Sequence, residues 1–114
     1  YQLAKKYKVK LAWGTDLLFN PANTKNQNQG ILKLQKWFSN FEILKMVTHD
    51  NAELLALSGA RNPYPGKLGV IEEDAWADLI LVDGDVLKDI TLLGDPEKNF
   101  IMIMKGGEIY KNRV

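Results

Sequence analysis

The first stretch of the chain passes from a helical to an extended pattern of apolar residues. Leu3 and Tyr7 share one face of a helix expected over residues 1–8, and lysines occupy the other face. A short apolar run over residues 9–13 follows, and Gly14 ends it, which predicts a strand. A helix that leads into a short strand is typical of one half of an α/β unit.

Helical spacing returns after a polar loop over residues 20–29. Apolar residues then recur at intervals of three and four, which predicts helices. Three are expected: one over residues 31–38, one capped by Ser39 or Asn40, and one that restarts at Asp50 or Asn51 and ends at a left-handed Gly59.

The pattern changes from helical to extended near residue 60. Residues 61–69 contain two prolines and two glycines, which is typical of an irregular connector. Strands are expected over residues 68–71, 78–83, 100–104 and 109–110, with Gly106-Gly107 as the turn of a hairpin. The unbroken apolar centre of residues 78–83 is typical of a strand buried on both faces.

The chain therefore resembles an α/β piece of something larger. The strand over residues 9–13 has no partner strand in sight, and the strands after residue 60 would leave edges exposed. We expect these edges to pair with the remainder of a larger body or between copies of the chain. The location is expected to be cytoplasmic or is left open, since any targeting region would precede Tyr1.

Composition and charge exclude several classes of protein. The 114 residues carry 15 Lys and Arg against 14 Asp and Glu, so the net charge of +1 offers no case for a nucleic-acid or anionic-membrane partner. The absence of cysteine excludes a disulfide framework and a cysteine nucleophile, and a single histidine excludes a His-rich metal site. No apolar run approaches the roughly 18 residues of a membrane span.

Five motifs occur in order along almost the whole chain. They are Trp13-Gly14-Thr15-Asp16, the helical stretch over residues 48–57, residues 67–72, residues 77–83 and the hairpin over residues 104–110. In this order and at these distances they resemble the amidohydrolase superfamily of metal-dependent hydrolases. The imidazolonepropionase-like and Xaa-Pro-dipeptidase-like groups are the most similar.

The resemblance implies a (β/α)8 barrel with a small β-sandwich. Residues 1–60 would be the last barrel strand and the terminal helices, and residues 61–114 the C-terminal part of the sandwich. The family holds one or two divalent metals, commonly zinc, and hydrolyses C–N bonds of peptides, amides or cyclic amidine-like rings. By this resemblance Asp16 ends strand eight, where it binds metal and accepts a proton from the hydrolytic water.

The remaining metal ligands of the family have no counterpart here. Its His-x-His pair, the bridging residue of strand four and the histidines of strands five and six would all precede Tyr1. A catalytic zinc needs about three protein ligands, so we expect this chain alone to be inactive and to hold no metal. His49 lies in the helical stretch after the strand and is expected to be a surface residue without a partner.

Two simpler interpretations stay open. Asp16 is also a good turn or helix cap after Gly14, in which case the chain would be a non-catalytic structural or self-associating module. The loop over residues 17–29 would lie at the mouth of the barrel. Its Asn20, Asn23 and Thr24 are candidates for contacting substrate, and the alternative is that they only form turns.

Overall fold

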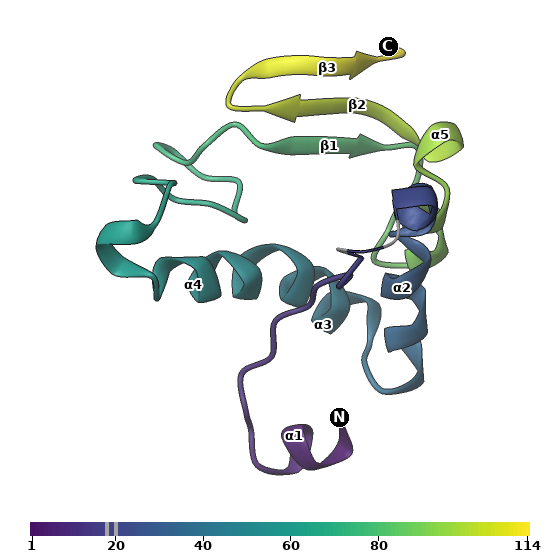
Figure 1. The fold of residues 1–114 in the computed structure, drawn as a ribbon. Helices are drawn as coiled ribbons and strands as arrows, with labels where there is room; N and C mark the ends of the chain where they lie inside the picture. The colour runs from purple at the N-terminus through teal and green to yellow at the C-terminus, as the bar shows by residue number, and fades with distance from the viewer. Residues whose placement is uncertain (18, 20) are drawn as a thin grey trace.

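A computed structural model describes residues 1–17, 19 and 21–114, and Figure 1 shows a three-stranded sheet set apart from a helical layer. The helical elements are α1 (Gln2–Lys6), η1 (Pro21–Asn26), α2 (Gln29–Leu32), η2 (Lys33–Lys36), α3 (Asn40–Lys45), η3 (Met46–Asp50), α4 (Asn51–Ala56), η4 (Gly59–Arg61), η5 (Ile90–Gly94) and α5 (Pro96–Asn99). The strands are β1 (Leu79–Val82), β2 (Phe100–Lys105) and β3 (Glu108–Asn112). Among the described helices, none combines the length and apolar character that crossing a bilayer requires.

The sheet is antiparallel in the order β1-β2-β3, so the strands expected over residues 78–83, 100–104 and 109–110 are confirmed. Gly106 and Gly107 have φ values of +57° and +84°, which side chains with a Cβ rarely adopt. The N–H of Gly106 also donates to Asp78 Oδ1 at 2.6 Å. The hairpin predicted from the glycine pair is therefore confirmed.

Two other expected strands are wrong. Residues 9–13 form no strand, because no backbone in the described part of the chain forms a ladder with them. Residues 68–71 form none either, since Gly69 takes a φ of +71° and interrupts the extended run. Only a single bridge, between Lys67 and Ala75, forms in that region.

The helices after residue 39 make one continuous rod. The Ser39 side chain accepts from the Glu42 N–H, and the Glu42 carboxylate accepts from the Ser39 N–H, which is a capping box. Of the two expected caps, Ser39 is the one confirmed. The expected restart at Asp50 or Asn51 is wrong, because a π-helical turn, η3, carries α3 directly into α4. Within the polar loop, residues 21–26 form a 3-10 helix.

The capping box makes stability depend on pH. Hydrogen bonds from Ser39 and then from Lys5 hold the pKa of Glu42 below its usual 4.5. A lowered folded-state pKa stabilises the fold above the usual value, and the contribution is lost as the pH falls through the lowered one. We expect Ser39→Ala to reduce the free energy of unfolding by about 1 kcal/mol near neutral pH, measured by urea denaturation. Ser39 Oγ also donates to the Glu42 carboxylate at 2.9 Å, so that part of the cost should disappear on acidification, whereas the bond from the Ser39 N–H to Glu42 persists in the variant. A cost that is the same at every pH would contradict the side-chain contact with Glu42.

The buried core joins the two halves of the sequence. Its members come from α2, η2, α3, η3, η5, β2 and the turn before α3: Ile31, Leu34, Phe38, Ile43, Met46, Ile90, Leu93 and Phe100. Ile43 and Ile90 are completely buried. Asn28 Nδ2 donates to the Leu93 carbonyl at 2.9 Å and ties the start of α2 to η5. The core therefore anchors the helical layer to the beginning of the sheet.

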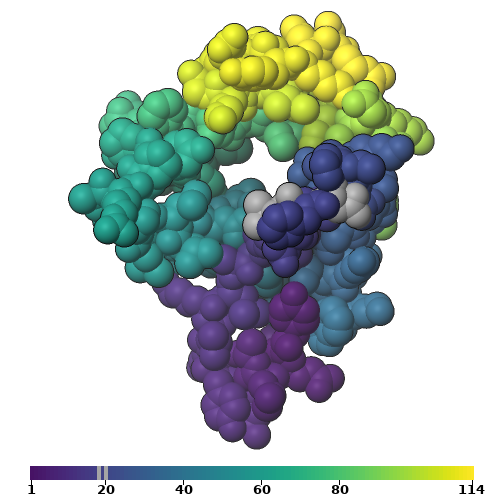
Figure 2. Space-filling model, in the orientation of Figure 1, coloured from purple at the N-terminus to yellow at the C-terminus, as the bar shows by residue number. Residues whose placement is uncertain are grey.

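The rest of the sheet is poorly covered. Ile80 and Leu81 point to opposite faces of β1 and are 54% and 51% exposed, so the expectation that this strand is buried on both faces is wrong for this chain. Figure 2 shows an opening between the sheet and the helical layer. The accessible surface is 8554 Å², whereas a compact monomer of this mass exposes about 6,300 Å².

Candidate functional site

Asp16, the residue on which the sequence resemblance centres, lies at the end of the irregular segment that carries Trp13. It is exposed, and its φ of +52° places it in the left-handed region. Aspartate tolerates this conformation better than most residues, yet it is uncommon outside glycine. Lys8 and Asp74 also have left-handed φ values, of +53° and +65°, so the backbone conformation alone does not distinguish Asp16.

The segment before Asp16 is attached to the helical layer at Trp13. The Trp13 N–H donates to Asn51 Oδ1 at 2.8 Å, and Asn51 Nδ2 donates to the Trp13 carbonyl at 3.0 Å. The indole ring lies over Gly30, where an added Cβ would come within 2.8 Å of the ring. Backbone and side chain of Trp13 are thus held by two different helices.

The loop candidates make local bonds. Thr24 Oγ1 donates to the Pro21 carbonyl at 2.7 Å, and Asn26 Nδ2 donates to Asn23 Oδ1 at 3.1 Å, all within η1. Asn20 lies outside the described residues. Within the described chain no hydrogen bond joins Asn23 or Thr24 to Asp16, and these local bonds are those expected of turn-forming residues.

His49 does have partners, contrary to the sequence-based expectation. Its Nδ1 lies 2.9 Å from Asp50 Oδ1 and 3.9 Å from Glu53 Oε2, and one ligand atom from each of the three residues falls within 4.8 Å of the others. The spacing His-Asp-x-x-Glu would have indicated this cluster if the helix had been predicted to continue through Asp50, because residues four apart share a helix face.

Two lysines already neutralise the carboxylates of this cluster. Lys10 Nζ lies 3.1 Å and 3.2 Å from the two oxygens of Glu53, and Lys45 pairs with Asp50. Partial burial raises the pKa of Asp50, but hydrogen bonds from Lys45 and His49 outweigh burial and leave that pKa below its usual value. A cation would have to displace both ammonium groups, so the cluster is an ion-pair network rather than a metal centre.

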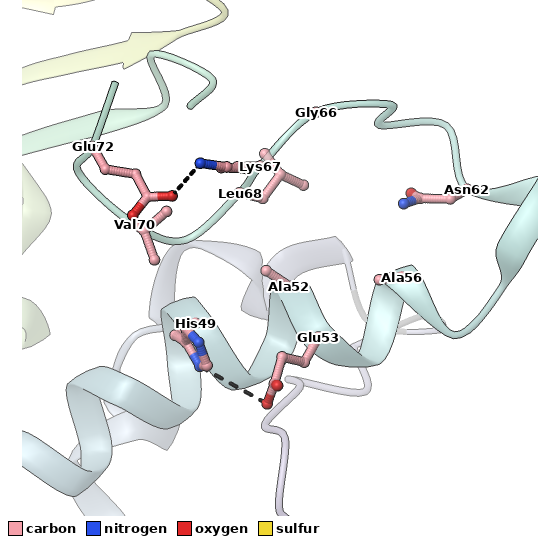
Figure 3. Close-up of a pocket in the computed structure, with 10 residues that line it drawn as sticks. All are labelled: His49, Ala52, Glu53, Ala56, Asn62, Gly66, Lys67, Leu68, Val70 and Glu72. Atoms are coloured by element: carbon pink, nitrogen blue, oxygen red, sulfur yellow. Dashed lines mark ion pairs between the residues drawn. The ribbon is translucent and has the colours of Figure 1, made fainter. Parts of the chain in front are cut away.

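A shallow cavity of about 270 Å³ lies beside the cluster. Figure 3 shows His49 and Glu53 on the helix and the Lys67–Glu72 ion pair, 2.8 Å long, on the segment that passes over it. The segment approaches closely because residue 69 is glycine: a Cβ there would lie 2.6 Å from the Thr48 carbonyl oxygen. The packing of this segment on the helix therefore forms the cavity, and Asp16 is not among the residues that line it.

The chain resembles known proteins in its three-dimensional structure. No model of a protein family matches the chain, and neither does any curated protein. Among solved structures, a crystal structure of an amidohydrolase aligns with 97% of this chain at a TM-score of 0.82 and 30% identity. The amidohydrolase resemblance is confirmed. A crystal structure of a prolidase complexed with N-methylphosphonate-L-proline aligns with the same share of this amidohydrolase-like chain, with a TM-score of 0.81 and 27% identity.

The amidohydrolase-like chain covers 25% of each of these two structures. The likeness implies a metal-dependent family, so the described residues can be tested against a metal site. Asp16 is a single carboxylate, a catalytic zinc needs about three protein ligands, and the only clustered ligands of the described residues are the ion-paired set around His49. A complete metal site does not fit the residues of the chain alone.

Proposed function

We propose that this chain is the C-terminal part of a metal-dependent hydrolase that acts on C–N bonds. Residues 11–16 would be the last strand of a (β/α)8 barrel, α3 to α4 part of its terminal helices, and β1 to β3 part of a β-sandwich. The observation that carries the proposal is the alignment of 97% of the chain with both an amidohydrolase and a prolidase. One architecture shared by two C–N hydrolases favours the same class of reaction here.

Asp16 is the proposed catalytic residue. Barrel enzymes place their chemistry at the carboxyl ends of strands, and an exposed carboxylate there can act as a general base. It would accept a proton from the water that attacks the carbon and then deliver that proton to the leaving nitrogen. A peptide-like bond to proline is the first substrate to assay, because the prolidase was solved with N-methylphosphonate-L-proline.

The exposed surface supports a position inside a larger body. The chain exposes about 2,200 Å² more than expected of a compact monomer of its mass. If a partner surface of equal area covered this excess, the two faces together would bury about 4,400 Å², which lies within the roughly 2,000–5,000 Å² of permanent interfaces. We propose that the remainder of the barrel covers the open side of the sheet and helices.

Metal content tests the proposal. We expect the dialysed 114-residue chain to hold well under roughly a tenth of an equivalent of zinc, measured by elemental mass spectrometry, because it lacks the about three protein ligands that a catalytic zinc needs. A longer protein that contains this chain should hold about one or two equivalents and hydrolyse Xaa-Pro dipeptides. Chelation should remove that activity and added zinc should restore it.

Two results would contradict the proposal. Hydrolysis by the longer protein that is insensitive to chelation would exclude a metal-dependent reaction. About one equivalent of zinc on the 114-residue chain would mean that copies assemble a site between them, contrary to the argument from missing ligands.

A further inference from the structure

We infer that Asn51 is a positioning residue whose side-chain amide pairs with the backbone of Trp13 and thereby sets the path of the chain into Asp16. In a β-ladder, one residue exchanges both an N–H and a C=O bond with its partner. Trp13 makes that same pair of bonds, 2.8 Å and 3.0 Å long, with a single amide group. The catalytic consequence rests on the proposed function of Asp16, whereas the anchoring itself does not.

Both sides of the Asn51 amide, the oxygen and the NH₂ group, take part in these contacts. An asparagine side chain offers one oxygen acceptor and two N–H donors. The oxygen accepts from Trp13 N–H, and Nδ2 donates to the Trp13 carbonyl and, at 3.4 Å, to the Val47 carbonyl. An amide oriented by three bonds, one of them to its own helix, holds a single rotamer and can act as a rigid anchor.

The helix is built to direct Asn51 at Trp13. The π turn η3 ends at Asp50, immediately before Asn51. Because one residue turns a regular helix by about 100°, a turn with one extra residue changes the direction in which all later side chains point. Without η3, the Asn51 side chain would point to another side of the helix, away from Trp13. The anchoring of Trp13 by Asn51 therefore depends on the π turn.

The π turn is contacted from outside the helix and bonded within it. Gly69, with a φ of +71°, lies against the backbone of Thr48 and His49, and within the helix Thr48 Oγ1 donates to the Leu44 carbonyl at 2.7 Å. Beyond the anchor, Gly14 has open space where a Cβ would be, so packing around that residue does not constrain the chain. The position of Asp16 therefore depends on how Trp13, three residues before it, is held.

Hydrogen exchange of the Trp13 backbone amide in the 114-residue chain measures the anchor directly. Asn51→Ala removes both bonds and should accelerate exchange at the Trp13 amide by about tenfold, because losing the net free energy of roughly one hydrogen bond changes the opening equilibrium by about that factor. Asn51→Asp is nearly isosteric and keeps an acceptor for the Trp13 N–H, but it loses the donor to the Trp13 carbonyl, so a smaller acceleration is expected. This second variant also serves if Asn51→Ala fails to fold.

Asn28→Ala is the matched control. Asn28 also donates from a half-buried amide to a distant carbonyl, that of Leu93, and among the described residues it makes no hydrogen bond to Trp13. The control should leave Trp13 exchange unchanged. Equal exchange at Trp13 in wild type, Asn51→Asp and Asn51→Ala would overturn the inference.

In the longer hydrolase, Asn51→Asp should lower kcat by about tenfold or more with little change in KM, because the base is misplaced while the substrate-binding loops are untouched. Asn28→Ala should keep normal kcat. An unchanged kcat in Asn51→Asp, in an enzyme that Asp16→Asn inactivates, would overturn the positioning role. Turnover that survives Asp16→Asn would instead overturn the proposed function, and hydrogen exchange would still decide the anchoring of Trp13.

Discussion

Asp16→Asn is expected to lower kcat of the hydrolase that contains this chain by about 100- to 10,000-fold, the usual contribution of a general base. Asparagine has the same shape as aspartate but cannot accept a proton at neutral pH. It also tolerates the left-handed φ of +52° at this position, so the backbone should not change. The measurement is steady-state turnover of a Xaa-Pro dipeptide at saturating zinc, with circular dichroism to confirm the fold.

Asp74→Asn provides a control of the same chemistry. Asp74 is also exposed and also left-handed, with a φ of +65°, and it lies in the turn before the sheet. The two substitutions therefore remove the same charge from the same backbone conformation. We expect normal turnover from Asp74→Asn, and near-normal turnover from Asp16→Asn would show that Asp16 only shapes a turn.

Ile43→Ala is expected to reduce the free energy of unfolding by about 2–5 kcal/mol. Ile43 lies on α3 and is 0% exposed in a core of only eight residues, so its deleted methyl and methylene groups leave a cavity in that core. Small domains are stable by only about 5–15 kcal/mol, and this core is small. The substitution should therefore unfold a large fraction of the chain, measured by urea denaturation followed by circular dichroism.

Ile80→Ala removes the same atoms from a site that is 54% exposed on the edge strand β1. Its cost should be well below that of Ile43→Ala, since little of the side chain leaves water on folding. Equal costs for the two variants would contradict the position of Ile43 at the centre of the core.

Local sequence was sufficient where the physical cause is local. The Ser39–Glu42 capping box needs only residues three apart, and the hairpin needs only two glycines that accept positive φ. The order of the five motifs was enough to predict the amidohydrolase resemblance that the structural comparison confirms.

The errors have a common cause. Apolar alternation over residues 9–13 describes side chains, whereas a strand requires a backbone partner, and the described chain places a side-chain amide there instead. The continuity of the helix through Asp50 depends on a π turn pressed against Gly69, which no capping rule anticipates. The pairing of His49 with Glu53, four residues further along, depends on that continuous helix.

The sequence by itself determined the caps, turns, apolar faces and family resemblance of this protein, because each follows from residues close together or from motifs in linear order. Only the tertiary structure decided that Asn51 holds Trp13 and that lysines occupy the carboxylates around His49. Asn51–Trp13 and Lys10–Glu53 join residues 38 and 43 positions apart, whereas Lys45 and Asp50 are five apart on the helix that continues through the π turn. Their geometry depends on how the helices and the segment over residues 66–72 pack, and periodicity along one chain does not encode that packing.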